Sequence, residues 1–435
     1  MHRRLTILLA WLAVVLGCGD DAADVPDDTG FGPEASGGDA AVDASPDARP
    51  ERDAGPPSDA DSDAGACPPT ETRDCVVGAC PALTIEGETP EATGVFHGFG
   101  DPVVRADPTH AGRLWLGYSF PRVAELASGE TALAPSLHLA RSDDDGRTWT
   151  VVSQLFAAAP APSPAPRGVA PGYASYEVLN FVAADTSGWY GVRLEYWAPP
   201  GSSYRPDPRS FALAVSYASR PTELAAGPAQ RLGSTFAHPG VVDVDLNGLD
   251  PSLRTCALWN EPALHYEDGV LYLATQCQVY EGDEPADERH VVVVFRADAT
   301  PDVTSLAWRY LGVLADASLA AELGDAKLMQ TEIARGVDGR LLVIMNPSHS
   351  DPITGAEIHL GCRVLELVSL DPPELRRACG ALVVHQRIEA TDQDFGTGSC
   401  GYDASSETGV ILTRRPDPRS RPGSGFTLHA TGLRP

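Results

Sequence analysis

The stretch SDDDGRTW at residues 142–149 gives the first strong indication of fold class. Ser142 and Asp144 are residue types that hydrogen-bond a turn backbone locally, and Gly146 adopts a positive φ without steric cost. Trp149 supplies a large apolar anchor beneath such a turn. Short apolar runs flank the stretch at residues 137–140 and 150–155. The stretch therefore predicts a tight hairpin between two β-strands.

This octapeptide fits the pattern Ser-x-Asp-x-Gly-x-Thr-Trp and resembles the Asp box of sialidases and related β-propellers. The resemblance covers the box itself and the rhythm of strands over residues 95–435. In that family the box is structural and lies away from the active site, which implies that Ser142, Asp144, Gly146 and Trp149 serve the fold. The resemblance also implies a tyrosine nucleophile, for which Tyr402 is the candidate. It further implies an arginine clamp for a substrate carboxylate, with Arg105, Arg335 and Arg363 as candidates.

The rest of the chain after Cys67 is rich in short apolar runs separated by Gly, Pro, Asp and Ser. Only residues 318–328 have a short helical pattern. A polar residue opens one strong strand at regular intervals: Asp101, Asn180, Glu261, Glu332 and Tyr402. A recurring period in a strand-rich chain is typical of propellers. We therefore predict an all-β fold, a β-propeller of four-stranded antiparallel sheets spanning residues 67–435.

The five openings predict five blades. The last module is short, so we expect an early strand near Leu83 or Val95 to complete the ring and leave no sheet edge unpaired. Six blades are the alternative, if residues 157–175 or 228–256 contain further strands.

The opening residues are also the candidate catalytic residues. In a propeller the innermost strand of each blade lines a central channel, so we expect Asp101, Glu177 or Asn180, Glu261, Glu332, and Tyr402 or Asp403 to converge at one end. Paired carboxylates about 5–10 Å apart perform glycoside hydrolysis. This arrangement resembles the five-bladed glycosidases of the arabinanase and invertase kind. The resemblance implies Asp101 as base or nucleophile and Glu261 as acid.

Four further residues are predicted to bind the substrate. Trp259 is a candidate platform for a sugar ring, His97 lies near Asp101 in sequence, and Asn180 stands close to where the related glycosidases have a second-blade aspartate. Arg335 is the fourth.

Two functions follow from these features. The first is a glycoside hydrolase, sialidase-like in fold, that acts on extracellular glycans. The second is a non-catalytic propeller that binds a glycan or a protein at the cell envelope, because no sequence context matches the arginine clamp and the second-blade aspartate is missing. The sequence contains no Walker loop, dinucleotide fingerprint or HExxH motif, so we expect no cofactor. We expect a monomer.

The eight cysteines after Cys18 predict disulfides, because an even number in an exported chain usually pairs. Cys256 with Cys277, and Cys362 with Cys379, each bracket a predicted hairpin and are the expected pairs. No CxxC pair occurs, and Cys75 and Cys80 have no histidine at ligand spacing, so we expect no metal site.

The N-terminus indicates export. Basic residues 2–4 precede an apolar run at 5–16, which is too short to span a bilayer. The sequence predicts a signal peptide at 1–17, and Val15-Leu16-Gly17-Cys18 resembles the lipobox of bacterial lipoproteins, which implies lipidation of Cys18. We therefore expect a protein of the cell envelope, held at the membrane by its lipid alone.

An acidic linker follows the expected lipidation site. Residues 19–66 contain 14 acidic residues and two arginines, and almost no bulky apolar residue. We predict a disordered linker, because this composition buries too little apolar surface to offset ordering entropy. The linker carries −12 of the net charge of −28, and the remaining −16 is spread over the rest of the chain, which argues against nucleic acid as a partner because such binding needs basic patches.

Overall fold

The computed structural model describes residues 69–75, 79–90, 96–163, 171–185, 188–201, 211–234, 242–281, 284–350, 357–389, 396–416 and 425–435. The expected signal peptide, Cys18 and acidic linker lie outside the described residues. In the described part the fold is nearly all-β, with one short α-helix, α1 (Ala317–Leu323). No described helix has the length and apolar character to cross a bilayer.

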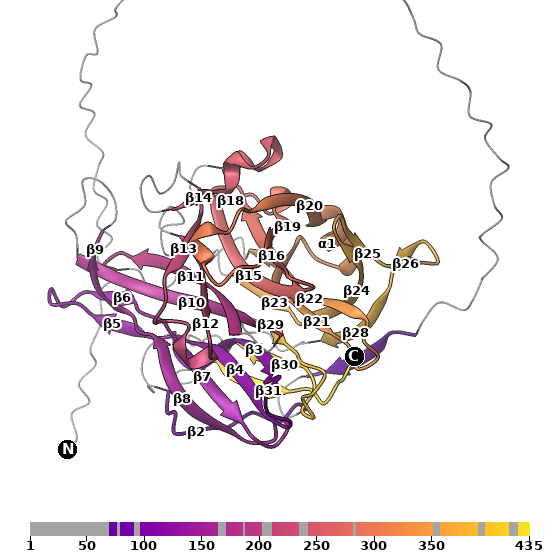
Figure 1. Ribbon diagram of the computed structural model, residues 1–435, viewed down its shortest axis with the longest axis horizontal. Coiled ribbons are helices and arrows are strands. Elements are labelled where there is room, and N and C mark those ends of the chain that lie inside the picture. The colour runs from indigo at the N-terminus through magenta and orange to yellow at the C-terminus, as the bar shows by residue number, and fades with distance from the viewer. Residues whose placement is uncertain are drawn as a thin grey trace, which may run out of the picture. The chain divides into compact units, whose positions relative to one another are not determined.

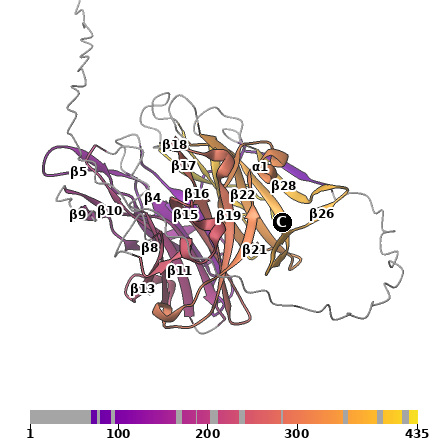
Figure 2. The same cartoon turned by 90° about the horizontal axis from the view of Figure 1, so that it is seen from above.

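Three separate sheets come first along the chain. The first has the order β3 (Gly100–Ala106), β4 (Leu114–Phe120), β7 (Ser136–Ser142), β8 (Trp149–Phe156) and β2 (Ile85–Glu86). The second has the order β9 (Ala159–Pro162), β10 (Pro171–Ala184), β11 (Gly188–Ala198), β12 (Ala212–Ala218), β13 (Ala229–Gly233) and β14 (Val244–Asp245). The third consists of β15 (Leu258–Glu267), β16 (Val270–Gln278), β19 (Val291–Asp298) and β20 (Arg309–Ala315), and Figure 2 shows β15, β16 and β19 next to one another.

The last third of the chain forms a ten-stranded sheet that contains two antiparallel meanders. One runs through β21 (Lys327–Arg335), β22 (Leu341–Ser350), β24 (Cys362–Leu370) and β28 (Val384–Glu389), with β25 (Pro373–Leu375) and β1 (Glu71–Asp74) at its edges. The other runs through β29 (Gly396–Gly401), β30 (Ile411–Arg414) and β31 (Thr427–Ala430). The strand β23 (Glu357–Leu360) joins them, because it pairs with both β22 and β29.

Short ladders complete the described strands. They are β5 (Val123–Glu125) with β6 (Thr131–Leu133), β17 (Tyr280–Glu281) with β18 (Glu284–Pro285), and β26 (Arg377–Ala378) with β27 (Ala381–Leu382).

One strand of each sheet or meander belongs to a closed ring. Strand β3 contacts β10, β10 contacts β15, β15 contacts β21, β21 contacts β29, and β29 contacts β3. Figure 1 shows these five strands around the middle of the folded part. The sheets are therefore arranged around an axis as in a propeller, with β3, β10, β15, β21 and β29 innermost.

The apolar core is divided among the interfaces between successive sheets. Leu139 of the first sheet packs in one cluster with Phe181 of the second, and Leu213 of the second packs with Phe295 of the third. Further clusters join the third sheet to β21, β22 and β24, the two meanders to each other, and the second meander to the first sheet. Each sheet therefore buries both of its faces, which explains the near-continuous apolar runs in the sequence.

The N-terminal part of the described chain runs along sheet edges. Strand β1 pairs with β28, the Leu83 amide donates to the Leu428 carbonyl at 2.8 Å, and β2 pairs with β8. The segment around Leu83, where the sequence predicted an early strand, thus lies beside β31 but forms only an isolated bridge with it, between Ala82 and His429.

The turn at residues 142–149 joins β7 to β8. The Ser142 hydroxyl donates to Asp144 Oδ1 at 2.7 Å and accepts a hydrogen bond from the Gly146 amide at 2.9 Å. The Thr148 amide donates to Asp144 Oδ1 at 2.9 Å, Gly146 has φ 90°, and Trp149 is buried. These contacts are internal to the hairpin, so they explain its sequence without any bound ligand.

Two expectations about local structure need correction. Cys256 pairs with Cys277 as predicted, but Cys362 pairs with Cys400 and not with Cys379, because β24 and β29 come together across the ten-stranded sheet. Cys75 pairs with Cys80, and Cys379 is also disulfide-bonded. Helix α1 ends at Leu323, earlier than the expected 328, because Gly324 adopts φ 103° and the next strand begins at Lys327.

Candidate active site

A β-bulge at the same place in each innermost strand creates the candidate site. The ladder register shifts within β3, β10, β15, β21 and β29. At each shift one residue has φ between 47° and 52°: Asp101, Val178, Glu261, Gln330 and Ser399. None is a glycine, and the left-handed region costs such residues roughly 1–2 kcal/mol. Repeated strain of this kind concentrates at functional sites, where it re-aims side chains.

Asp101 is a partly exposed carboxylate that two side chains hold in place. Asp101 Oδ1 accepts hydrogen bonds from the Ser399 hydroxyl at 2.7 Å and from Gln330 Nε2 at 3.2 Å. The Asp101 amide donates to the Thr413 hydroxyl at 3.0 Å. Donors directed at a carboxylate stabilise its charged form. Asp101 is therefore held as a hydrogen-bond acceptor by side chains from β21 and β29.

Glu261 has the opposite environment. Its side chain is buried, and its Oε2 atom has no hydrogen-bond partner among the described residues. Burial, together with the negative charges of Asp101 and Glu177, raises the pKa of Glu261 well above its usual value. The surroundings of Glu261 therefore favour its protonated form.

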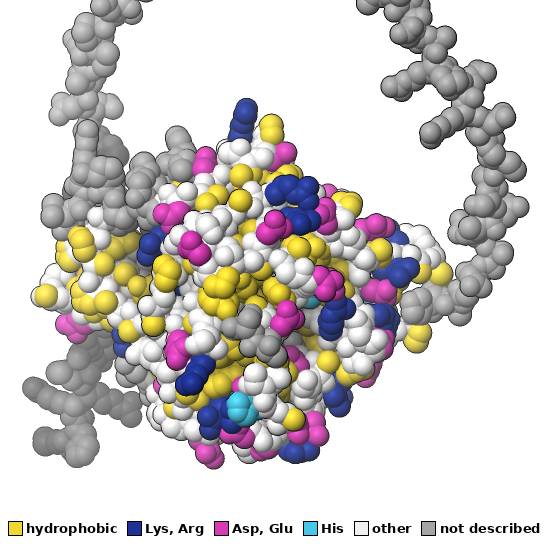
Figure 3. All heavy atoms as spheres, in the orientation of Figure 1, with side chains coloured by type: hydrophobic (Ala, Val, Ile, Leu, Met, Phe, Trp, Pro, Cys, Tyr) yellow, Lys and Arg dark blue, Asp and Glu magenta, His cyan; other side chains and the backbone are white. Residues whose placement is uncertain are grey.

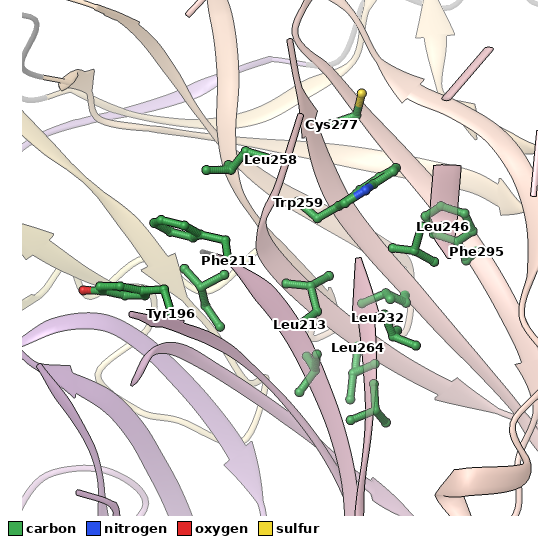
Figure 4. Close-up of a cluster of buried hydrophobic side chains, with 14 of the residues drawn as sticks. Tyr196, Phe211, Leu213, Leu232, Leu246, Leu258, Trp259, Leu264, Cys277 and Phe295 are labelled. Carbon is green, nitrogen blue, oxygen red and sulfur yellow. The ribbon is translucent and has the colours of Figure 1, made fainter. Parts of the chain in front are cut away.

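Glu177 is the third carboxyl group of this cluster. Burial and the charge of Asp101 raise the pKa of Glu177 to about 8, while the hydroxyl of Tyr196 acts in the opposite direction. Figure 4 shows the ring of Tyr196 near Phe211 with its hydroxyl directed away from the apolar cluster. Glu177 immediately precedes the strained Val178, so the bulge of β10 brings it into the group formed by Asp101 and Glu261.

Arg415 is a cation beside these acids. Its charge lowers the pKa of Glu177 and of Glu261, against the larger effect of burial. Its Nη1 atom hydrogen-bonds His359 Nε2, and its guanidinium lies 5.2 Å from the centre of the Phe426 ring. Burial and the charge of Arg415 hold the pKa of His359 far below its usual value, so this histidine is a neutral acceptor.

A second polar layer lies deeper along the innermost strands. Arg105 forms a buried ion pair with Glu332, and Asn180 Nδ2 donates to Glu332 Oε2 at 2.7 Å. Asn180 Oδ1 accepts from the Leu264 amide at 3.0 Å. Glu332 is two residues beyond Gln330, which is roughly 7 Å along a strand. The structure thus places Glu332 and Asn180 in a layer that connects β3, β10, β15 and β21, below the group of Asp101 and Glu261.

The other predicted site residues have separate surroundings. Trp259 is 1% exposed, donates to Asn247 Oδ1 at 2.8 Å, and lies between Leu258 and Phe295 in Figure 4. His97 is buried against Gly425. The Tyr402 hydroxyl donates to the Pro435 carbonyl at 3.1 Å, and burial raises the pKa of Tyr402 to about 12.

The three candidate clamp arginines do not share a partner. Arg105 pairs with Glu332, Arg335 with Glu267, and Arg363 with Glu389. Arg335 ends β21, five residues or roughly 16 Å beyond Gln330. The structure brings together Asp101 and Glu261 from the predicted set, and adds Glu177, Gln330, Ser399 and Arg415.

The sequence contained a signal for only one of these additions. Glu177 stood beside Asn180 as an alternative opening residue, whereas Gln330, Ser399 and Arg415 carry no motif. Among the described residues, no three His, Cys, Asp or Glu side chains are grouped so that they would hold a metal ion.

Comparison with known proteins gave structural similarities without a family. No protein-family model and no curated protein matches the chain. One similar solved structure is a variant fructofuranosidase from Schwanniomyces occidentalis complexed with fructosylnystose, with 8% identity, 78% of this chain and 58% of that chain covered, and a TM-score of 0.43. A second is a GH130 structure concerned with hydrolases that target β-1,2 mannosidic linkages in Candida mannan, with 12% identity, 84% of this chain and 94% of that chain covered, and a TM-score of 0.43. A third is a family 43 arabinoxylan arabinofuranohydrolase from Bacillus subtilis in complex with cellotetraose, with 13% identity, 77% of this chain and 62% of that chain covered, and a TM-score of 0.41. The chain spans less than two thirds of the first and third of these proteins. At such low identity the function has to be argued from the site.

Proposed function

We propose that the protein is a glycoside hydrolase whose active centre is the cluster of Asp101, Glu177 and Glu261. The observation that carries this proposal is the contrast between two neighbouring carboxyl groups. Asp101 accepts two side-chain hydrogen bonds, while Glu261 is buried with an unpaired oxygen. Such a contrast separates an ionised carboxylate from a protonated one, which is the requirement of glycosidic bond cleavage.

Each carboxyl group then has a role. Glu261 donates its proton to the leaving glycosidic oxygen, and Asp101 activates water or attacks the sugar as the bond breaks. Burial favours the protonated form of Glu261, and the charge of Asp101, with that of Glu177 when it is ionised, adds to this effect. The positive charge of Arg415 acts in the opposite direction and lowers the pKa of Glu261. The chemistry is assigned to carboxylates and not to Tyr402, because that hydroxyl is hydrogen-bonded to Pro435 and its pKa is raised.

Turnover of glycans by the purified protein tests this proposal. Aryl glycosides and plant, fungal and bacterial polysaccharides are incubated with the wild type, and released sugar is measured. We expect E261Q and D101N each to lower kcat/KM about a hundredfold, because each removes one half of the acid–base pair. The exposed Glu374→Gln variant is the matched control and keeps full activity.

Two results would count against the proposal. If the E261Q variant keeps the turnover of the wild type, Glu261 is not the acid. A wild type that binds glycans without releasing sugar supports the alternative, a carbohydrate-binding propeller without catalysis.

We further propose that the ring consists of five blades. Five bulged innermost strands, five contacts that close the ring and five apolar clusters between sheets support this count. The short last meander is completed by the segment around Leu83 beside β31. An experimental map with a sixth innermost strand would contradict the count.

We propose that the protein is exported and anchored to the cell envelope through a lipid on Cys18. The support is the sequence alone, with its basic and apolar N-terminus and the cysteine after Gly17. Expression in a bacterial host with radiolabelled palmitate tests it. We expect label in the wild type and none in C18A, while equal labelling of the two proteins would overturn the assignment.

A further inference from the structure

Gln330 occupies in β21 the position that Asp101 occupies in β3 and Glu261 in β15. All three sit at a β-bulge in the left-handed region, with φ 52° for Gln330. The Gln330 side chain is buried, and the residue is 7% exposed. A buried amide in a strained conformation has to satisfy its polar atoms internally. Its hydrogen-bond partners therefore indicate the role of this strained conformation.

Two donors fix the orientation of the Gln330 amide. Its carbonyl oxygen accepts a hydrogen bond from the Ser399 amide at 2.6 Å and another from Asn346 Nδ2. The Ser399 amide is a backbone donor and cannot reverse its role. The Gln330 carbonyl must therefore face β29, which leaves its amino group on the side of Asp101.

That amino group then meets the candidate base. Gln330 Nε2 donates to Asp101 Oδ1 at 3.2 Å, and the Ser399 hydroxyl donates to the same oxygen at 2.7 Å. The other carboxyl groups near Asp101 come from two other strands, Glu177 of β10 and Glu261 of β15. Donors from β21 and β29 thus hold Asp101 beside the carboxyl groups of β10 and β15.

We propose that Gln330 is a positioning residue that, with Ser399, orients Asp101 beside two other acids. This inference rests on the proposed function, because it gives Asp101 the role of base or nucleophile. Gln330 acts through Asp101 and does not contact the reacting atoms. A purely structural role, in which Gln330 only joins β21 to β29, is the competing explanation.

The pH profile separates the two explanations. Q330M keeps the length of the side chain but removes its donor. With one donor fewer on the charged carboxylate, the acid-side limb of the kcat/KM profile should move to higher pH by about one unit. S399A should move the limb in the same direction. A uniform loss of activity with an unmoved limb would overturn the proposal.

Gln230 provides a matched control. It is also buried, its carbonyl accepts from Trp308 Nε1 at 2.8 Å, and its amino group donates to the Leu306 carbonyl at 2.9 Å. It lies on β13, away from the innermost strands. Q230M should lower stability but leave the acid-side limb in place. If Q230M shifted the acid-side limb as much as Q330M does, the shift would be explained by the loss of stability and not by the lost donor to Asp101.

A stability measurement tests the same inference without turnover. Urea midpoints at pH 7 are compared for the wild type, Q330M, D101N and the double variant. We expect Q330M to lower the midpoint clearly in the wild type and much less in D101N, because the neutral amide needs the donor less. Equal losses in both backgrounds would overturn the inference. If the Q330M loss depends on Asp101 in this way but the wild type turns over no glycan, the proposed function is rejected while the positioning role of Gln330 stands.

Discussion

Replacing Arg105 by methionine should destabilise the protein by about 3–5 kcal/mol, which is the usual result of removing one partner from a buried ion pair. The side chains of Arg105 and Glu332 are 10% and 4% exposed. Glu332 lies 227 positions from Arg105, so this pair joins strands that are far apart in the sequence, and the arginine also donates to the carbonyl of its neighbour Val104 at 2.7 Å. Urea unfolding at pH 7 measures the loss.

The pH dependence of this loss identifies its cause. Burial already raises the pKa of Glu332, and the charge of Arg105 opposes that effect. R105M removes the positive charge that lowers the pKa of Glu332. Glu332 in the folded variant therefore holds its proton to higher pH than it does in the unfolded chain. Stability of the variant should then fall as pH rises above about 4.5, the ordinary value for glutamate. The loss at pH 8 should exceed the loss at pH 5.

Two further variants serve as controls. R105M/E332Q removes both charges and should recover much of the lost stability. R335A removes an exposed pair with Glu267, whose side chains are 48% and 40% exposed, and should cost less than about 1 kcal/mol. Figure 3 shows many basic and acidic side chains close together on the surface, where pairs of this exposed kind are expected to be weak. If R105M cost no more than R335A, the buried layer would not hold the ring together.

E177Q should stabilise the protein at alkaline pH by on the order of 3–5 kcal/mol while it lowers glycosidase activity. The pKa of Glu177 is raised to about 8, above the ordinary 4.5. Between these values the folded state binds a proton that the unfolded state lacks, so wild-type stability falls as pH rises through this window. Glutamine carries no charge and avoids this loss.

Unfolding curves from pH 5 to pH 9 measure the difference between E177Q and the wild type. The two proteins should be nearly equally stable near pH 5 and should diverge up to about pH 8 to 9. Glu261 is present in both proteins, but its pKa depends on the charge of Glu177, so the difference reports Glu177 together with its effect on Glu261. E374Q, at an exposed position, should follow the wild type at every pH. A constant difference across the range would show that Glu177 is not held protonated by the fold.

Local patterns explain which parts of the molecule were predictable. The hairpin at 142–149 depends on contacts within a few residues, so its sequence specifies it directly. Short apolar runs and turn residues predicted the strands, and the period of the opening residues predicted their arrangement around an axis. Asp101 and Glu261, which the structure brings together, were predicted as site residues because each opens such a strand.

The remaining site residues depend on contacts that the sequence does not display. Glu332 and Asn180 also lie near strand openings, yet a two-residue offset along the bulged strand moves them into the layer with Arg105. The pairing of Cys362 with Cys400 required β24 and β29 to meet, while sequence proximity favoured Cys379.

The sequence by itself determined that this chain forms many short strands with repeated polar openings, because turn chemistry and apolar alternation are local properties. Only the tertiary structure decided which of the opening residues lie close together. Ring closure places β29 beside β3 and β21, although Ser399 and Asp101 are 298 positions apart. The charge state of a carboxyl group depends on burial and on neighbours from other strands, and both exist only once the ring has formed.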